Sequence, residues 1–196
     1  LLMATVIITG ASRGIGRATA IELSNKSEVK NIILIASSYD ALLETEEKLN
    51  PKVNSKVIVF DLMETEKIEG LILDIYEEFG SIDWLLNIAG YTEPELLLDI
   101  TVDSLVKTYS INVFATIMLT KEVVKYMKEN KSSKILNVAS TAGSTPRPGW
   151  AVYASSKAAI INFSDTLSEE LAEYNISVYC VSPGRTATDL RRRLAP

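Results

Sequence analysis

A glycine-rich stretch near the N-terminus, residues 9–16 with the sequence TGASRGIG, constrains this chain more than any other feature. The apolar run VII precedes it and a helical pattern follows it. Glycine tolerates positive φ and lets the backbone approach a ligand closely, and a helix that begins there presents unpaired N–H groups to an anion. Strand, turn and helix in this order are typical of a site that binds a dinucleotide pyrophosphate. We therefore predict that six residues of this turn bind a cofactor: Gly10, Ser12, Arg13, Gly14, Ile15 and Gly16.

The spacing of these glycines is G-x-x-x-G-x-G, which differs from the more common G-x-G-x-x-G fingerprint. Strand-to-helix turns also use glycine where no ligand binds. A purely structural turn therefore stays open as the alternative at this point.

Composition narrows the class of protein. An apolar content of 47% with 23% charged residues is that of an ordinary globular chain, and 196 residues predict one domain over 1–196. The net charge of −5 gives no reason to expect a nucleic-acid partner. We expect no membrane span and no signal peptide, because no apolar run approaches the ~18 residues of a span and no basic segment precedes the first apolar run.

Two residue counts exclude further chemistry. The chain has no histidine, which rules out Ser-His-Asp and Cys-His catalysis and argues against a zinc site, so we expect no metal. Cys180 is the only cysteine and lies in an apolar run, so we expect a buried thiol. A chain with no intramolecular disulfide suits the cytoplasm, which is the expected location.

Short apolar runs alternate with longer helical patterns along the chain. Strands are predicted at 5–9, 31–36, 56–60, 82–87, 134–140 and 177–181, and helices at 15–25, 39–49, 64–79, 102–130 and 153–174. The strands show little alternation of polarity, as expected when both faces are buried. This pattern predicts an α/β fold of the Rossmann type: a doubly wound parallel sheet with strand order 3-2-1-4-5-6 and a cofactor crevice at the carboxyl ends of its strands.

The residues that follow the strands indicate which dinucleotide binds. After the second strand stands Ser37, where an acid would bind the ribose 2′-hydroxyl of NAD. Together with Arg13 this favours a 2′-phosphate, so we predict NADP(H), with NAD(H) as a possible second cofactor. A solvated surface arginine is the alternative for Arg13.

Two further strand ends are candidate cofactor contacts. Asp61, followed by Leu62, could accept from the adenine amino group, although a helix N-cap is the simpler interpretation of Asp61. After the fourth strand, Asn87, Ala89 and Gly90 are small or polar enough to lie beside a cofactor.

The densest group of chemically useful residues is Ser140 with Tyr153 and Lys157. Tyr153 and Lys157 lie four apart, so a helix places them on one face. A nearby ammonium favours the phenolate and so lowers the pKa of a tyrosine from about 10. The Ser140 hydroxyl could share a substrate oxygen with Tyr153. An amphipathic helix with a lysine that reaches solvent is the alternative for this pair.

Taken together, these motifs resemble the short-chain dehydrogenase/reductase family over essentially the whole chain. The resemblance rests on residues 9–16, 87–90, Asn112, Ser140, the Tyr153/Lys157 pair and 183–188. It implies that Tyr153 is the general acid/base, Ser140 orients the carbonyl, Lys157 lowers the tyrosine pKa and binds the nicotinamide ribose, and Asn112 holds a water in a proton relay. It also supports NADP, because members with a basic residue at the place of Arg13 usually prefer it.

The same resemblance implies that four residues line the nicotinamide: Pro183, Gly184, Thr186 and Thr188. Two departures from the family pattern are visible. Ile88 stands where a second Asn is usual, and the chain stops at Pro196, where members continue through a lid, a helix and a seventh strand. We therefore expect a C-terminally incomplete domain that lacks the seventh strand and the lid. The basic run at 191–193 is interpreted as a solvated turn.

We expect an NADPH-dependent enzyme that reversibly reduces a ketone or aldehyde to an alcohol. A 3-oxoacyl-thioester reductase, a sugar or polyol dehydrogenase and a xenobiotic carbonyl reductase are not distinguished, and a non-enzymatic dinucleotide sensor is the alternative. The resemblance implies a homo-oligomer, a dimer or a tetramer, that pairs through the helices at 102–130 and 153–174. Candidate substrate contacts lie on nearby loops: Tyr91, Glu93, Ser144, Arg147 and Trp150.

Overall fold

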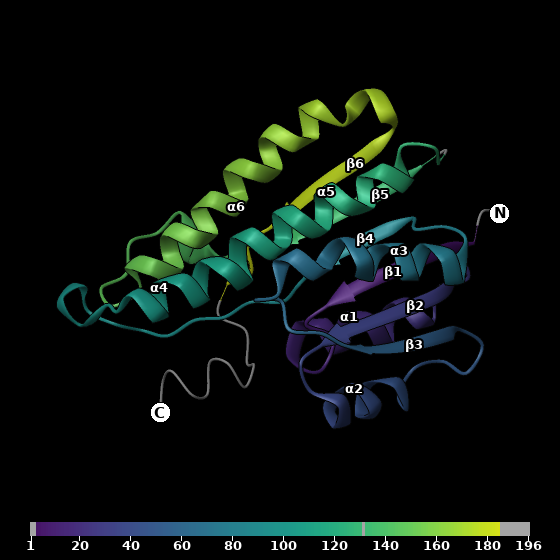
Figure 1. Ribbon diagram of the computed structural model, residues 1–196, viewed down its shortest axis with the longest axis horizontal. Coiled ribbons are helices and arrows are strands. Elements are labelled where there is room, and N and C mark those ends of the chain that lie inside the picture. The colour runs from purple at the N-terminus through teal and green to yellow at the C-terminus, as the bar shows by residue number, and fades with distance from the viewer. Residues whose placement is uncertain (1–2, 131, 185–196) are drawn as a thin grey trace.

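The computed structural model describes residues 3–130 and 132–184. Six parallel strands form one sheet in the order β3-β2-β1-β4-β5-β6, which confirms the predicted topology (Figure 1). The strands are β1 (Ala4–Thr9), β2 (Val29–Ala36), β3 (Asn54–Val59), β4 (Trp84–Asn87), β5 (Ser133–Val138) and β6 (Ile176–Val181). The α-helices are α1 (Gly14–Ser24), α2 (Tyr39–Glu46), α3 (Ile68–Phe79), α4 (Val102–Tyr109), α5 (Ala115–Met127) and α6 (Ala151–Glu170).

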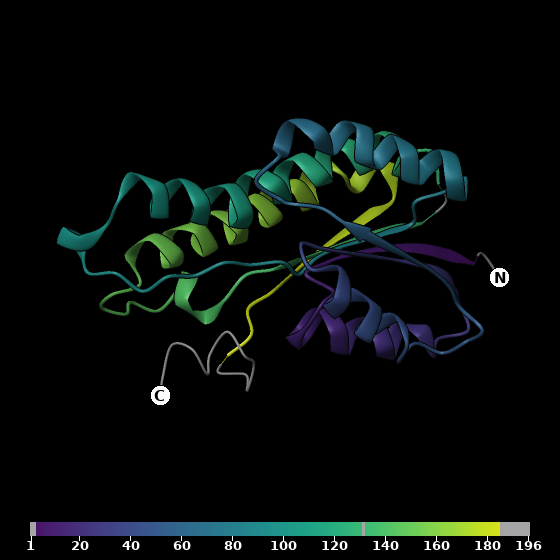
Figure 2. The ribbon, with the colours of Figure 1, turned by 60° about the horizontal axis from the view of Figure 1, so that its bottom comes forward.

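Helices cover both faces of the sheet, as Figure 2 shows, with α1 and α2 on one face and α3, α5 and α6 on the other. Successive side chains of a strand point to opposite faces, and β1 shows the result. Ile7 packs in the core under α3, α5 and α6, whereas Val6 and Ile8 pack in the core under α1 and α2. All three side chains are fully buried, which explains why the strands lack alternating polarity.

The long helix predicted at 102–130 is interrupted. The chain forms α4, then one π-helical turn, η3 (Ser110–Phe114), and then α5, which already ends at Met127. A π turn takes one additional residue into the helix without breaking it. The apolar pattern on either side still looks helical, so the sequence did not reveal the turn.

Several predicted boundaries were also wrong by a few residues. The helix predicted at 153–174 begins at Ala151 and ends at Glu170, followed by a separate 3₁₀ turn, η5 (Ala172–Tyr174). The strand predicted at 134–140 ends at Val138, and a 3₁₀ turn, η4 (Thr141–Gly143), follows it. Two more 3₁₀ turns, η1 (Thr65–Lys67) and η2 (Leu97–Asp99), precede α3 and α4. Strand ends depend on where the neighbouring strand stops, which local composition does not encode.

Cys180, predicted to be buried, is only partly buried. It lies on β6, whose outer edge pairs with no strand among the described residues. The described helices contain no segment that is both long and apolar enough to cross a membrane.

A polar network ties the amino ends of the strands together around Asp83. Its Oδ2 accepts from the backbone N–H of Thr5 at 2.8 Å and from the Ser81 hydroxyl at 3.0 Å. Its Oδ1 accepts from the Asn130 amide at 3.3 Å. Thr5 is 1% exposed, so its N–H depends on this carboxylate for a partner.

We predict that Asp83→Ala lowers the free energy of unfolding by about 1–3 kcal/mol, because the buried N–H of Thr5 loses its acceptor. Urea denaturation followed by tryptophan fluorescence measures this change. The control Asp74→Ala removes an exposed carboxylate from α3 and should change the free energy by less than about 0.5 kcal/mol. Equal effects of the two variants would contradict this role of Asp83.

Candidate active site

A crevice of about 470 Å³ lies at the carboxyl ends of the strands. It brings together most of the residues singled out in the sequence: Gly10, Ser12, Arg13, Gly14, Ile15, Gly16, Ser37, Asp61, Leu62, Ala89, Gly90, Ser140, Tyr153, Lys157, Pro183 and Gly184. Thr186, Thr188 and the basic run at 191–193 lie outside the described residues. Asn87 and Asn112 do not line the crevice.

The glycine turn has no room for side chains at two of its positions. Gly10 has φ of +67°, and a Cβ there would lie 2.8 Å from the backbone N and Cα of Ala89. A Cβ on Gly16 would lie 2.1 Å from the carbonyl oxygen of Gly10. The turn therefore packs backbone against backbone, on the end of β4 on one side and on α1 on the other. Such a close approach keeps this wall of the crevice low enough for a ligand to lie against the backbone.

Thr9, the last residue of β1, fixes the chain that follows β4. Its hydroxyl oxygen accepts from the backbone N–H of Ile88 at 3.1 Å and of Ala89 at 3.2 Å. Its hydroxyl group also lies 3.4 Å from the Leu86 carbonyl, to which it donates. Because Ile88 contributes through its backbone, the isoleucine keeps this contact although the family usually has Asn there.

Asn87 was predicted to contact the cofactor, but the structure places its side chain inside the protein. Its amide donates to Asn137 Oδ1 at 2.9 Å and to Thr120 Oγ1 at 3.2 Å. Asn137 in turn donates to the Ser164 hydroxyl at 2.9 Å. Asn87 is 4% exposed and thus joins β4 to β5, α5 and α6. Its position after a buried strand gave no indication of which way the side chain points.

After β2 and β3, the crevice is bounded by Ser37 and Asp61, together with Arg13 of the glycine turn. The Oδ1 of Asp61 accepts from the backbone N–H of Met63 at 2.9 Å. Asp61 is therefore not the N-cap of the helical turn that follows, which is Glu64, and it lines the crevice. Sequence reasoning missed Phe60 and Met63, which flank this acid in the lining.

Tyr153 and Lys157 lie on one face of α6 and both line the crevice. The Nζ of Lys157 is 5.9 Å from the centroid of the Tyr153 ring and donates to the Val138 carbonyl at 2.7 Å. The Lys157 side chain is buried, and this burial lowers its pKa to about 8, opposed by the nearby Cys180.

Burial is the largest influence on the pKa of Tyr153. Burial raises the pKa of Tyr153 above its usual value, while the Ser140 hydroxyl and the charge of Arg147 act in the opposite direction. The Lys157 ammonium is directed at the Val138 carbonyl, and its effect on the tyrosine stays a prediction. In this arrangement Tyr153 keeps its proton, as a group that donates a proton must.

Ser140 is held opposite Tyr153 by the η4 turn. Its Oγ accepts from the backbone N–H of Ala142 at 3.2 Å, and the turn packs directly on α6. A Cβ on Gly143 would lie 2.9 Å from both the Ala158 nitrogen and the Lys157 carbonyl carbon. Sequence reasoning missed Gly143. The glycine three residues after Ser140 was the available signal.

Asn112 lies in the π turn, and its side chain is fully engaged. Its Oδ1 accepts from the backbone N–H of Tyr91 at 2.8 Å, and its amide donates to the Tyr91 carbonyl at 2.9 Å and to the Ser156 hydroxyl at 3.0 Å. A Cβ on Gly90 would lie 3.5 Å from Lys157 Nζ and 3.7 Å from Asn112 Oδ1. Asn112 therefore fixes the segment after β4 against α6, next to the lysine.

Of the candidate substrate contacts, Tyr91 lines the crevice and the other four do not. Its hydroxyl donates to Glu93, and this hydrogen bond is the main reason that the pKa of Tyr91 rises to about 12. Lys107 lies 4.4 Å from the centroid of the Tyr91 ring and also lines the crevice, as does Ile111. Sequence reasoning missed Lys107 and Ile111, which lie four residues apart in α4 and the π turn that follows it.

The remaining candidates lie outside the lining of the crevice. Trp150 packs its ring edge-on against Tyr153, with 5.6 Å between centroids. Arg147 donates to the Thr141 hydroxyl at 3.2 Å. Ser144 is exposed and bonds the Thr141 carbonyl. Among the described residues, no group of three or more Cys, Asp or Glu side chains is placed to hold a metal ion.

Comparison with known proteins agrees with this geometry. The family model described as short chain dehydrogenase matches residues 4–196. A 3-oxoacyl-[acyl-carrier-protein] reductase from Synechocystis is 33% identical over 189 residues, which cover 96% of this chain and 76% of the relative. An NADP-dependent 3-hydroxy acid dehydrogenase from Schizosaccharomyces pombe is 32% identical over 188 residues, or 94% and 72% of the two chains.

Solved structures agree as well. The crystal structure of NAD⁺-bound xylitol dehydrogenase superimposes with a TM-score of 0.86 at 34% identity and covers 92% of this chain and 70% of that one. The fold, the crevice and these similarities lead to one conclusion: the chain belongs to the short-chain dehydrogenase family of NAD(P)-dependent oxidoreductases.

Proposed function

We propose that this protein uses NADP(H) to reduce a ketone or aldehyde to an alcohol, reversibly, with Tyr153 as the general acid. The observation that carries the proposal is a single crevice that runs from the glycine turn to Tyr153 and Lys157. A dinucleotide anchored at one end would therefore reach the tyrosine at the other. The bound nicotinamide would supply a hydride to the carbonyl carbon.

The residues at the adenosine end fit a phosphorylated ribose. Arg13 and Ser37 line this end, and the two residues directly after β2 are serines rather than acids. The guanidinium supplies positive charge and the hydroxyl a donor, which suit a 2′-phosphate better than a 2′-hydroxyl. One similar protein is named as NADP-dependent, and another was solved with NAD⁺ bound. We therefore infer a preference for NADP(H) and keep NAD(H) as a second cofactor.

At the other end of the crevice, Tyr153 would donate a proton to the substrate. Burial favours the neutral phenol of Tyr153, which can donate its proton to the substrate oxygen as negative charge develops there. The Ser140 hydroxyl lies on the same side and would hold that oxygen in place. Lys157, with its Nζ beside Gly90, would bind the nicotinamide ribose, and its positive charge would stabilise the phenolate left after proton transfer. Asn112 would take part through the segment it fixes, since its side chain is already bonded.

We predict that Tyr153→Phe lowers kcat at least about 100-fold, because it removes the proton donor without changing the shape of the pocket. NADPH oxidation measured with a 3-oxoacyl thioester, a ketose and a simple ketone would test this. NADPH affinity should stay within about threefold of wild type, because the phenol oxygen acts on the substrate oxygen. The control Tyr179→Phe changes an exposed tyrosine of β6 and should keep full activity.

Full turnover by the Tyr153→Phe protein would reject the assigned acid. A wild-type protein that binds NADPH but reduces no carbonyl compound would favour the alternative of a dinucleotide sensor.

Cofactor preference has its own test at Arg13. We predict that Arg13→Ala weakens binding of NADPH about 10-fold and of NADH less than about twofold, since only the phosphorylated cofactor loses a charged partner. Isothermal titration with both cofactors measures the difference. Lys52→Ala, which removes an exposed cation from the loop before β3, is the control. Equal losses for NADPH and NADH would contradict the proposed preference.

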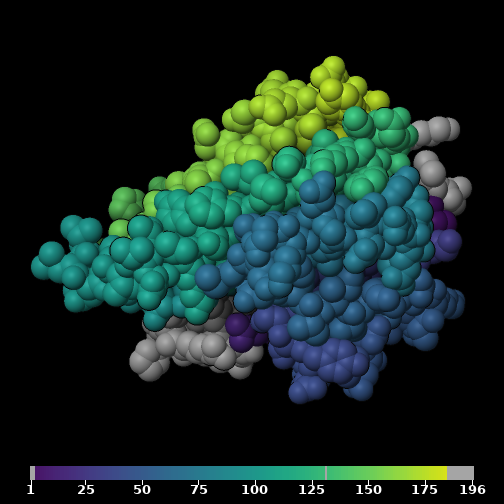
Figure 3. All heavy atoms as spheres, in the orientation of Figure 1, coloured from purple at the N-terminus to yellow at the C-terminus, as the bar shows by residue number. Residues whose placement is uncertain are grey.

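We also propose that the protein is a homo-oligomer that pairs through α4 and its flanks. Several large apolar side chains are exposed there: Leu97 is 77% exposed, Leu98 96%, Val102 74%, Val106 47% and Phe114 50%. Figure 3 shows the 97–102 segment projecting at the left of the molecule. Exposed apolar surface of this kind marks interaction sites.

Not all residues expected at this interface are available for it. Apolar residues of α5 and α6 could serve either the interface or the core, and Leu119 and Leu167, which are 1% and 9% exposed, lie in the core. Ile117 and Phe163 are partly buried. Sedimentation velocity should show a species larger than a monomer, and Val106→Glu should dissociate it. A monomeric wild-type protein would remove the proposal.

A further inference from the structure

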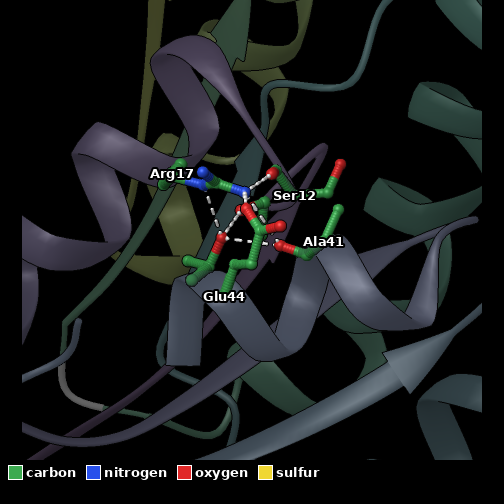
Figure 4. A network of polar contacts seen from close by, with 6 residues as sticks. Ser12, Arg17, Ala41 and Glu44 are labelled. Atoms are coloured by element: carbon green, nitrogen blue, oxygen red, sulfur yellow. Dashed lines mark hydrogen bonds and ion pairs between the residues drawn. The ribbon is translucent and has the colours of Figure 1, made fainter. Parts of the chain in front are cut away.

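A compact hydrogen-bond network lies behind the glycine turn, centred on Arg17 of α1. Its Nη2 donates to the Ser12 carbonyl at 2.5 Å and to the Ala41 carbonyl at 3.1 Å, and pairs with Glu44 at 3.0 Å (Figure 4). Its Nε donates to the Thr45 hydroxyl oxygen at 2.9 Å. One side chain therefore ties the turn before α1 to α2. Arg17 does not line the crevice.

Thr45 is the second member of this network and is fully buried. Its hydroxyl hydrogen has two carbonyl acceptors, Ala11 at 2.9 Å and Ala41 at 3.1 Å. Two consecutive carbonyls of the turn therefore accept hydrogen bonds from side chains: that of Ala11 from Thr45 and that of Ser12 from Arg17. We call Arg17 and Thr45 together the turn clamp.

The turn clamp determines where the next two amide groups point. All described peptide bonds are trans, and in a trans peptide the N–H points opposite to the C=O. Because the Ala11 and Ser12 carbonyls point toward the clamp, the N–H groups of Ser12 and Arg13 point away from it. Both residues line the crevice. Within the described residues neither N–H has a protein acceptor.

Two adjacent N–H donors beside the Arg13 guanidinium form a favourable place for an anion. Ser12 and Arg13 line the same crevice as Ser37, at the end where we propose that the adenosine binds. A helix N-terminus would contribute here too, because α1 begins at Gly14 without a side-chain cap on its first turn. The ligand that fits this chemistry is the phosphorylated ribose of an adenosine nucleotide.

We propose that Arg17 and Thr45 are positioning residues, which hold the Ser12 and Arg13 amides toward the crevice and so set the affinity for the adenosine-2′-phosphate end of the cofactor. This inference rests on the proposed function. Neither Arg17 nor Thr45 lines the crevice, so both would act on the ligand only through the backbone of the turn. Lysine would not replace Arg17 fully, because a single ammonium lacks the planar fork that reaches the carbonyls and Thr45 together.

The test is binding of 2′,5′-ADP, a probe that contains only the adenosine end of NADP. Isothermal titration of the intact chain should show affinity about 10-fold weaker for Arg17→Met, the size of one lost charge-assisted hydrogen bond. Arg17→Lys should fall between Arg17→Met and wild type. Thr45→Val, which keeps the shape but loses the hydroxyl, should weaken 2′,5′-ADP binding several-fold, and Thr45→Ser should restore it.

Steady-state kinetics separate positioning from a general structural defect. The KM for NADPH should rise with the same factor as the 2′,5′-ADP dissociation constant, while kcat at saturating NADPH should fall less than about twofold. The control Glu44→Gln removes only the exposed ion pair and keeps the carbonyl contacts, so it should change affinity less than about twofold. Lys56→Met, at a surface ion pair on β3, is the control for loss of a cation elsewhere.

Wild-type affinity in Arg17→Met would overturn the inference. The inference would also be overturned if kcat fell by the same factor as the affinity and the variant unfolded at a clearly lower temperature than wild type. A wild-type protein that binds neither 2′,5′-ADP nor NADPH would overturn the proposed function itself, which is a different and recognisable result.

Discussion

The close backbone contact between the glycine turn and the end of β4 is the constraint on which the rest of this structure depends. Gly10 lies so near Ala89 that no side chain fits between them, and Gly16 lies still nearer to the Gly10 carbonyl. The Thr9 hydroxyl stabilises the same contact, because it accepts hydrogen bonds from two backbone N–H groups that follow β4. The crevice opens directly above this junction, so its floor is backbone rather than side chain. The turn can take this position beside the end of β4 only because Gly10 and Gly16 carry no Cβ.

Different contacts hold the residues at the two ends of the crevice in place. At the glycine turn, hydrogen bonds from Arg17 and Thr45 hold the carbonyls of Ser12 and Ala11. At the other end, Gly143 lets the η4 turn press on the backbone of α6, which sets Ser140 opposite Tyr153. Asn112 then fixes the segment after β4 against α6 from the opposite side. Groups that act on one ligand are thus held by separate contacts that local sequence does not connect.

Burial, more than pairing, determines the charges at the reactive end. It acts in opposite directions on the two groups of α6: it favours the neutral phenol of Tyr153 and lowers the pKa of Lys157. Both effects follow from moving a charged group out of water. The i, i+4 spacing placed the two side chains on one face but said nothing of their depth. Their common location at the crevice is confirmed, while the effect of the lysine on the tyrosine pKa stays a prediction.

The sequence by itself determined the fold class, the strand order and the crevice at the carboxyl ends of the strands, because these follow from apolar periodicity, glycine positions and the handedness of parallel connections. It also identified most residues that line the crevice, since strand ends converge at one edge of such a sheet. Only the tertiary structure decided that Asn87 and Asn112 turn inward, that Gly143 and Arg17 support the site, and that a π turn interrupts the predicted long helix. The physical reason is that side-chain direction, burial and hydrogen-bond partners depend on groups far apart in the chain, which spacing along the chain does not specify.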